Sequence, residues 1–142
     1  MDLRECTRNE IIKRTKVNTS LVQSLIEMSA IKENVIKKVD LDEVNINAFI
    51  PMAYDSMREL LEAYCVLHGF KVLNHDCLGK LCKELFSKFD LILFDRLRYI
   101  RNGINYYGEK ISFSEGNIII KNILGIKQEM LKETQRLLKN IP

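Results

Sequence analysis

The chain has 142 residues, 46% of them hydrophobic and 29% charged, which fits one globular domain with a core and excludes a disordered chain. The net charge of +3, from 22 Lys and Arg against 19 Asp and Glu, permits weak phosphate contacts but does not by itself predict a nucleic-acid partner. Only six Gly and two Pro are present, which favours long helices over a sheet of many strands.

The N-terminal segment MDLRECTRNEIIKR lacks the apolar stretch of a signal peptide. No apolar run approaches the length that spans a bilayer. We therefore expect a cytoplasmic protein without membrane contact. Residues 1–18, with their basic stretch Lys13–Lys16, are expected to be either a loose basic arm or a short helix.

The four cysteines are Cys6, Cys65, Cys77 and Cys82, and no two of them form a CxxC pair. Two histidines at zinc-finger spacing are also absent from the sequence, so a structural zinc site has little support. His75, Cys77 and Cys82 remain as a chance metal site. The favoured interpretation is that all four are buried or idle thiols in a reducing cytosol.

Apolar spacing predicts a first helix over about Thr19–Val39, with Thr19 or Ser20 as its N-cap. Its expected core stripe is Leu21, Leu25, Met28, Ile31 and Val35. After a linker over 39–44, Asn45 or Asn47 caps a second helix that runs to His68, with Gly69 ending it. Pro51 lies near the first turn, where a missing N–H costs little.

The second helix has the clearest amphipathic pattern in the chain. Its expected core face is Ile50, Ala53, Tyr54, Met57, Leu60, Leu61, Tyr64 and Leu67, and its expected polar face is Asp55, Arg58, Glu59 and Glu62. A third, shorter helix is predicted over about Asp76–Ser87, with Asn74 as a candidate cap.

A fourth helix is predicted over Asp90–Tyr107, ended by Gly108. Ser112 followed by Glu115 resembles a capping box and opens a last helix to about Lys139, whose regularity Gly116 and Gly125 weaken. Short links between long amphipathic helices predict an all-α, antiparallel bundle of four to five helices in one domain over residues 1–142.

The segment RLRYIRNGINYYG, residues 96–108, carries the strongest functional signal. On a helix, one side is the apolar stripe Leu93, Leu97, Ile100, Ile104 and Tyr107, while Arg98, Arg101, Asn102 and Asn105 group on the far side, flanked by Tyr99 and Tyr106. Guanidinium groups match phosphate geometry and aromatic rings stack on bases, so this face suits a nucleotide or RNA. The alternative is a solvated polar face, or arginines paired with Asp55, Glu59 or Glu62.

RNGINYYG resembles the RNxxxHY element of HEPN domains, the "higher eukaryotes and prokaryotes nucleotide-binding" family. Residues 54–71 are similar to that family's second helix and the link after it, and the resemblance covers Asn45 to Leu138. It implies a four- to five-helix bundle that dimerises with its motifs facing each other across a shared cleft. Many members are metal-independent ribonucleases of toxin–antitoxin or defence systems. Others bind nucleotides or pair with a minimal nucleotidyltransferase.

The resemblance assigns Arg101 and Asn102 to the RN pair, Tyr106 to the histidine position and Tyr107 to the tyrosine after it. This departure matters, because a tyrosine with a pKa of about 10 is a poor general base near neutral pH. Asn105 cannot titrate, so it cannot take over the role of the histidine. Nothing in the sequence places His68 or His75 beside Arg101. Tyr106 lies five residues from Arg101 and would point to a different side of a regular helix. We therefore expect Gly103 to distort the helix and turn Tyr106 toward Arg101.

Three hypotheses follow. The first is a HEPN-like homodimer that binds RNA, a nucleotide or a nucleotidyltransferase-type antitoxin with little or no cleavage, and the expected ligand-binding residues are Arg98, Arg101, Asn102, Asn105, Tyr106 and Tyr107. The second is an active ribonuclease in which Arg101, Asn102 and Tyr106 align and stabilise the reacting phosphate. The third is a non-catalytic helical interaction module. None of them requires a metal or a cofactor.

Overall fold

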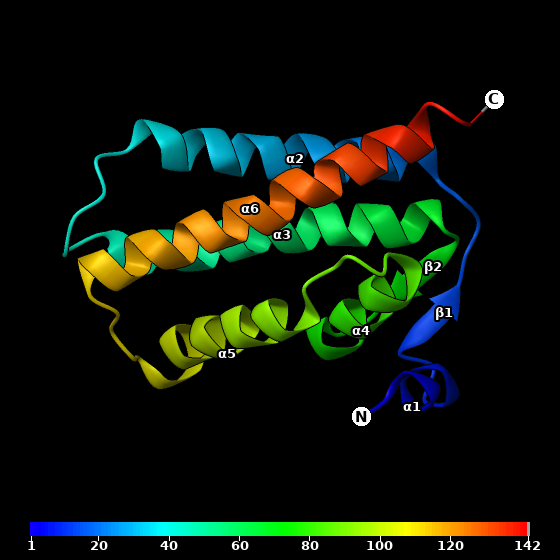
Figure 1. The fold of residues 1–142 in the computed structure, drawn as a ribbon, viewed down its shortest axis with the longest axis horizontal. Helices are drawn as coiled ribbons and strands as arrows, with labels where there is room; N and C mark the ends of the chain where they lie inside the picture. The colour runs from blue at the N-terminus through cyan, green and yellow to red at the C-terminus, as the bar shows by residue number, and fades with distance from the viewer. Residues whose placement is uncertain (142) are drawn as a thin grey trace.

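The computed structural model describes residues 1–141, which form six helices and one two-stranded sheet (Figure 1). In chain order these are α1 (Leu3–Arg8), β1 (Ile12–Arg14), α2 (Thr19–Lys38), α3 (Ile46–Leu67), β2 (Phe70–Val72), α4 (His75–Leu85), α5 (Leu91–Tyr107) and α6 (Phe113–Leu138). The predicted all-α helical bundle is confirmed. No helix among these residues is long and apolar enough to cross a membrane.

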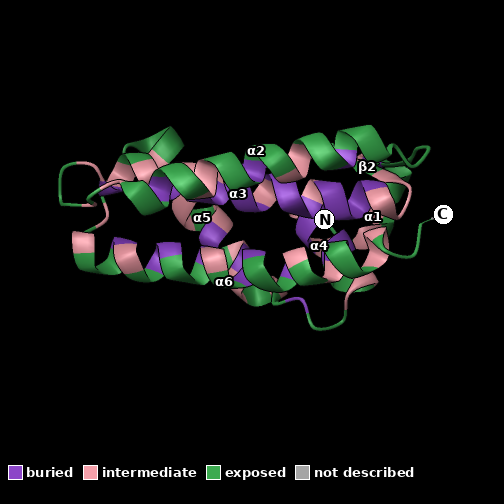
Figure 2. Ribbon diagram, turned by 90° about the horizontal axis from the view of Figure 1, so that it is seen from above, coloured by how far each residue is buried: buried purple, intermediate pink, exposed green. Residues whose placement is uncertain are grey.

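The central element is α3, which has α2 and α6 along it on one side and α4 and α5 on the other (Figure 1). Neighbouring helices α2 and α3 are antiparallel, whereas α6 runs in the same direction as α3. Figure 2 shows buried residues along most of α3 and on the inner side of α6. The predicted core face of α3 is confirmed, with Tyr54, Met57, Leu61 and Tyr64 almost completely inaccessible.

The core-facing side of α2 differs from the prediction. Of the expected stripe, Leu21, Met28, Ile31 and Val35 are 44%, 45%, 55% and 42% exposed, and the buried residues are instead Val22, Ser29 and Ile36. These three buried residues form a line along α2 beside the predicted one. The small side chain of Ser29 lets α2 approach α3 closely. Its hydroxyl donates to the carbonyl of Ser56 at 2.5 Å. The helix is therefore rotated toward this line.

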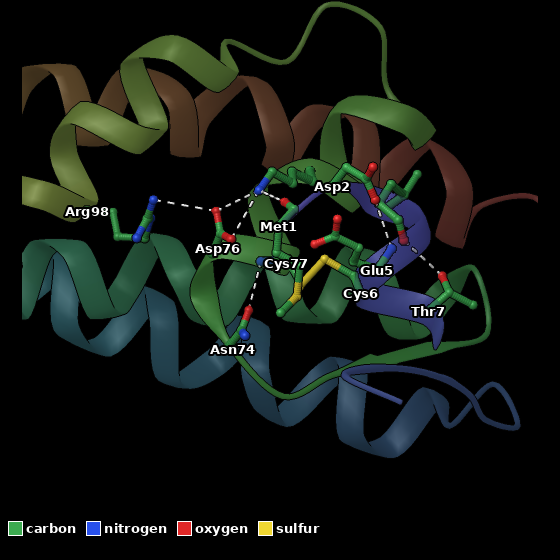
Figure 3. Close-up of a disulfide and its surroundings, with 11 residues drawn as sticks. Met1, Asp2, Glu5, Cys6, Thr7, Asn74, Asp76, Cys77 and Arg98 are labelled. Atoms are coloured by element: carbon green, nitrogen blue, oxygen red, sulfur yellow. Dashed lines mark hydrogen bonds and ion pairs between the residues drawn. A yellow bond between two sulfur atoms is a disulfide. The ribbon is translucent and has the colours of Figure 1, made fainter. Parts of the chain in front are cut away.

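The N-terminal segment is not a loose arm: it contains a short helix, α1, which was one of the two predicted alternatives, and also the unpredicted strand β1. β1 covers part of the basic stretch and pairs antiparallel with β2, and Ile12 lies opposite Val72. A disulfide joins Cys6 of α1 to Cys77 in the first turn of α4 (Figure 3). The expectation of four idle thiols is thus wrong for these two residues, which are 71 positions apart and which the fold alone brings together.

The remaining cysteines, Cys65 and Cys82, are buried free thiols with sulfur atoms 3.8 Å apart, as expected. Among residues 1–141, no three His, Cys, Asp or Glu side chains group closely enough to hold a metal ion. The chance site of His75, Cys77 and Cys82 does not form. The sulfur of Cys77 is bonded to Cys6 instead.

Several helix ends follow the predicted caps. Asn74 caps α4 and Ser112 caps α6, while Gly108 ends α5 in a left-handed conformation with φ 64°. The cap of α2 is Asn18, not Thr19 or Ser20, and its side chain accepts the N–H of Leu21. Asn45 precedes α3 without a side-chain capping bond, since its side chain closes the preceding turn. The third predicted helix begins one residue earlier and ends at Leu85.

Two glycines of α6 have different surroundings, although the helix is continuous through both. Gly116 is buried, and a Cβ atom there would overlap the side chain of Ile46 and lie 3.3 Å from Cδ1 of Ile50. Gly125 has nothing within 4 Å of the same position. Gly116 therefore permits the close crossing of α6 over α3, whereas Gly125 has no such role.

Gly116→Ala and Gly125→Ala form a matched pair of substitutions on one helix. We expect Gly116→Ala to lower the free energy of unfolding by about 1–3 kcal/mol, because the added methyl group overpacks the α3 contact. We expect Gly125→Ala to raise it by up to about 1 kcal/mol through helix propensity. Denaturant unfolding followed by circular dichroism measures both. Equal effects of the two substitutions would contradict the close crossing.

The disulfide is expected to contribute strongly to stability, because it closes a loop of 71 residues. The chain-entropy relation gives a loss of roughly 4 kcal/mol for the double variant Cys6→Ala/Cys77→Ala. Guanidinium unfolding with and without a phosphine reductant measures this loss. The reductant should lower the stability of the natural protein and leave the variant unchanged. A natural protein insensitive to the reductant would show that the bond does not form.

Candidate functional site

Helix α5 carries the predicted motif on a well-fixed backbone. Asp90 caps it through the N–H of Leu93 at 3.0 Å, and Phe94 and Leu97 bury one side in the core. Of the predicted apolar stripe, Leu97 is buried and Leu93, Ile100 and Ile104 pack against the core. Tyr107 is 80% exposed, so its place in that stripe was wrong. At the last turn the helix leaves the core, and apolar spacing no longer reports burial.

Arg101 projects toward α3, with 14% of its side chain exposed. Its guanidinium carbon lies 5.4 Å from the ring centre of Tyr54 and 5.8 Å from that of Tyr106. Its nitrogens reach Asp55 at 3.7 Å, the Asn102 side-chain oxygen at 3.3 Å and the Tyr106 hydroxyl at 3.4 Å. All these polar contacts are long, so the guanidinium is held mainly by the two rings.

Arg98 lies on the same side of α5 and faces α4. One terminal nitrogen is 3.5 Å from carboxylate oxygens of both Asp76 and Asp95. Asp76 also binds Lys80 at 3.0 Å, and Figure 3 shows it pointing toward Arg98 beside the disulfide. The Nε atoms of Arg98 and Arg101 are both buried without a hydrogen-bond partner. Both arginine side chains are therefore largely buried, and the alternative of a simply solvated polar face does not describe them.

The alternative of arginine–carboxylate pairing is correct in part. Asp55 faces Arg101, whereas Glu62 binds Arg58 at 2.9 Å and Glu59 binds Lys32 at 2.8 Å. Arg58 also approaches Asp55 to 3.7 Å, so one carboxylate lies between two guanidinium groups. The charge of this cluster is nearly balanced, but no carboxylate binds Arg101 closely.

His75 is the residue that sequence reasoning missed. It is the first residue of α4, and its Nδ1 lies 3.2 Å from the hydroxyl of Tyr54, whose ring packs on Arg101. Burial, reinforced by the positive charges of Arg58 and Arg101, lowers the pKa of His75 to about 4. Burial likewise raises the pKa of Tyr54 above its usual value. At neutral pH the pair is an uncharged imidazole beside an uncharged phenol.

No pattern in the sequence placed His75 near Arg101, because 26 residues and a tertiary contact separate them. The only available signal was the Asn74 cap, which puts His75 at a helix start. His68, the other histidine, packs its ring 4.7 Å from that of Tyr64 and takes no part in the cluster.

The rest of the predicted site lies around a shallow hollow of about 220 Å³, which we call the tyrosine hollow. It is lined by Tyr99, Asn102, Gly103, Tyr106, Tyr107 and Glu109. The structure thus brings together Arg101, Asn102 and Tyr106, and puts Tyr107 at the edge. Asn105 is exposed and makes no side-chain hydrogen bond within residues 1–141, and Arg98 belongs to the neighbouring α4 contact.

Tyr106 reaches Arg101 without the helix distortion that we expected. Helix α5 is α-helical through Gly103 to Tyr107, and the length of the Tyr106 side chain covers the distance. Tyr106 is 67% exposed, so it is not a core residue of its own chain. It remains available to a ligand or a partner.

A scan against protein-family models finds no match for this chain, and searches of curated proteins and of solved structures find none either. The resemblance to HEPN domains therefore depends on the RNGINYYG motif and on the order of the helices.

The lowered pKa of His75 predicts a pH dependence of stability. Between its ordinary value of 6.5 and the folded value of about 4, the unfolded chain binds a proton that the folded chain does not. The free energy of unfolding should therefore fall as pH is lowered through this window. Histidine NMR titration should give a midpoint near 4 for His75.

His75→Gln is the matched control, since it cannot titrate but keeps a hydrogen-bonding group. This variant should lose part of the pH dependence between 6.5 and 4, while His68 still contributes. An unchanged slope, or a His75 midpoint near its ordinary value, would contradict the buried, uncharged imidazole.

Proposed function

We propose that the protein is a HEPN-like domain that binds the phosphate of RNA or of a nucleotide at Arg101. The supporting observation is the surroundings of that guanidinium, which lies within cation–π distance of the rings of Tyr54 and Tyr106 while Asp55, the carboxylate paired with it, is 3.7 Å away. A guanidinium that is oriented by aromatic rings but weakly neutralised retains N–H donors for a phosphate, which accepts such bonds in a bidentate manner.

The tyrosine hollow favours a ligand that contains bases. Tyr99, Tyr106 and Tyr107 are 76%, 67% and 80% exposed, unusually high values for three aromatic rings around one hollow. Aromatic side chains stack on unpaired bases with little sequence preference, and a neighbouring cation binds the backbone. Single-stranded RNA or a nucleotide has both groups.

The proposal includes a homodimer in which two tyrosine hollows form a shared cleft, as in the family that the motif resembles. The exposed rings of Tyr106 and Tyr107 provide apolar surface for such a contact. A toxin–antitoxin or defence setting, with a nucleotidyltransferase-type antitoxin as partner, belongs to the same proposal.

A second candidate, a metal-independent ribonuclease, is supported by the position of His75. Tyr54 joins this imidazole to Arg101, so a titratable base lies in the cluster although the motif position holds Tyr106. Its pKa of about 4 makes it a weak base, and a phosphate bound at Arg101 would raise that pKa toward the useful range. The third candidate, a plain interaction module, is supported by the pairing of Arg98 with Asp76 and Asp95.

Arg101→Ala should weaken the binding of a fluorescent single-stranded RNA by about 10- to 100-fold, because hydrogen bonds to charged groups contribute about 1.5–3 kcal/mol. Fluorescence anisotropy in EDTA measures this, and binding should weaken as salt rises. Arg136→Ala is the control, since Arg136 is an exposed residue of α6 that forms an ion pair with Glu133. Equal binding by both variants would contradict a phosphate site at Arg101.

The same samples decide between the first two candidates. Cleavage of the RNA in EDTA that disappears in both Arg101→Ala and His75→Gln would establish the ribonuclease. Binding without cleavage would support the binding role. If the folded protein neither binds nor cleaves the RNA, the third candidate, an interaction module, is the one that remains. Light scattering tests the dimer independently.

A further inference from the structure

A second hollow, of about 420 Å³, lies between α2, α3 and β2, and shares no lining residue with the tyrosine hollow. We call it the ribbon pocket, because a strand of the β1–β2 ribbon forms one wall. Its apolar lining is Leu21, Leu25, Cys65, Val66, Phe70 and Val72. A volume of roughly 300 to 1,000 Å³ with a mainly apolar lining and a few polar groups is typical of small-molecule sites.

The charged residues around the ribbon pocket are not balanced. Lys16 and Lys71 line it, and neither has an ion-pair partner among residues 1–141. The carboxylate in the lining, Glu62, is already bound by Arg58 at 2.9 Å. Both lysines are exposed, so their positive charges lie at the rim of the apolar cavity, where they favour a ligand with an anionic group.

The register of the ribbon adds a second, independent observation. Lys13 of β1 lies directly opposite Lys71 of β2, and like charges at such positions destabilise an antiparallel pair. Arg14, opposite Phe70, adds a third positive charge to the ribbon. An anion bound at Lys71 would reduce this repulsion.

The lining also indicates the apolar part of the ligand. Phe70 is the one aromatic residue around the pocket, and the guanidinium of Arg14 lies 5.5 Å from its ring centre. Arg14 therefore covers one face of the Phe70 ring, on which a base could otherwise stack. The other apolar residues of the lining are aliphatic, apart from the thiol of Cys65. This lining fits an aliphatic chain better than a planar base.

We propose that the ribbon pocket binds a small amphipathic anion with an aliphatic chain, of which a free fatty carboxylate is the simplest example. The chain lies against Leu21, Leu25 and Val66, and the carboxylate is held by Lys16 and Lys71. The site uses none of the residues proposed to bind RNA. The two functions can therefore fail separately.

The test is calorimetric titration of the full chain with decanoate below its micellar concentration. Lys16→Glu/Lys71→Glu should weaken binding at least tenfold, while Lys121→Glu/Lys132→Glu, an equal charge change on exposed residues of α6, should leave it unchanged. Decanol and acetate, which supply the chain and the carboxylate alone, should each bind at least tenfold more weakly than decanoate.

Leu21→Asp and Met28→Asp are a matched pair on α2, because both side chains are almost equally exposed and only Leu21 lines the pocket. Leu21→Asp should weaken decanoate binding at least tenfold, and Met28→Asp should not change it. Circular dichroism confirms folding of each variant. No binding of decanoate, equal losses in the two variants, or decanol binding as tightly as decanoate would each overturn the proposal.

Sedimentation with lipid vesicles distinguishes binding of a free carboxylate from binding of a lipid head group. The protein should not sediment with phosphatidylglycerol vesicles at decanoate-saturable concentrations. Sedimentation that Lys16→Glu/Lys71→Glu abolishes, without decanoate binding, would replace the free ligand with a membrane surface. RNA anisotropy of the same variants should be unchanged, which keeps this test distinct from that of Arg101.

Discussion

The burial of α3 on nearly every side is the constraint on which the rest of the structure depends. Its two buried tyrosines provide much of the core, and their hydroxyls still find partners, His75 for Tyr54 and the carbonyl of Leu85 for Tyr64. Because α2, α4, α5 and α6 all pack around one helix, little of α3 reaches the surface, and Asp55, Arg58 and Glu62 form a narrow strip that does.

The strip connects the two candidate sites. Arg58 contacts Asp55, which faces Arg101, and Glu62, which lines the ribbon pocket. Two turns of one helix therefore contribute charged groups to both the ribbon pocket and the surroundings of Arg101. The same arginine neutralises the carboxylate in the ribbon pocket and competes for the carboxylate beside Arg101, so the ribbon pocket and the Arg101 guanidinium both remain favourable for anions.

The N-terminal segment also affects the site, although it lies far from the motif in sequence. The disulfide holds Cys77 in the first turn of α4, directly after His75 and Asp76. These two residues face Tyr54 and Arg98. A covalent link between α1 and this turn restricts the position of both residues.

The sequence by itself determined the helical class, the order of the long helices, the ends at Asn74, Gly108 and Ser112, and the proximity of Arg101, Asn102 and Tyr106, because all of these depend on contacts within a few residues. Only the tertiary structure decided the rotation of α2, the Cys6–Cys77 bond, the β-ribbon and the place of His75 beside Tyr54. Each of these joins residues distant in the chain. Local spacing offers two apolar lines on α2, for example, and the choice between them depends on which one packs against α3.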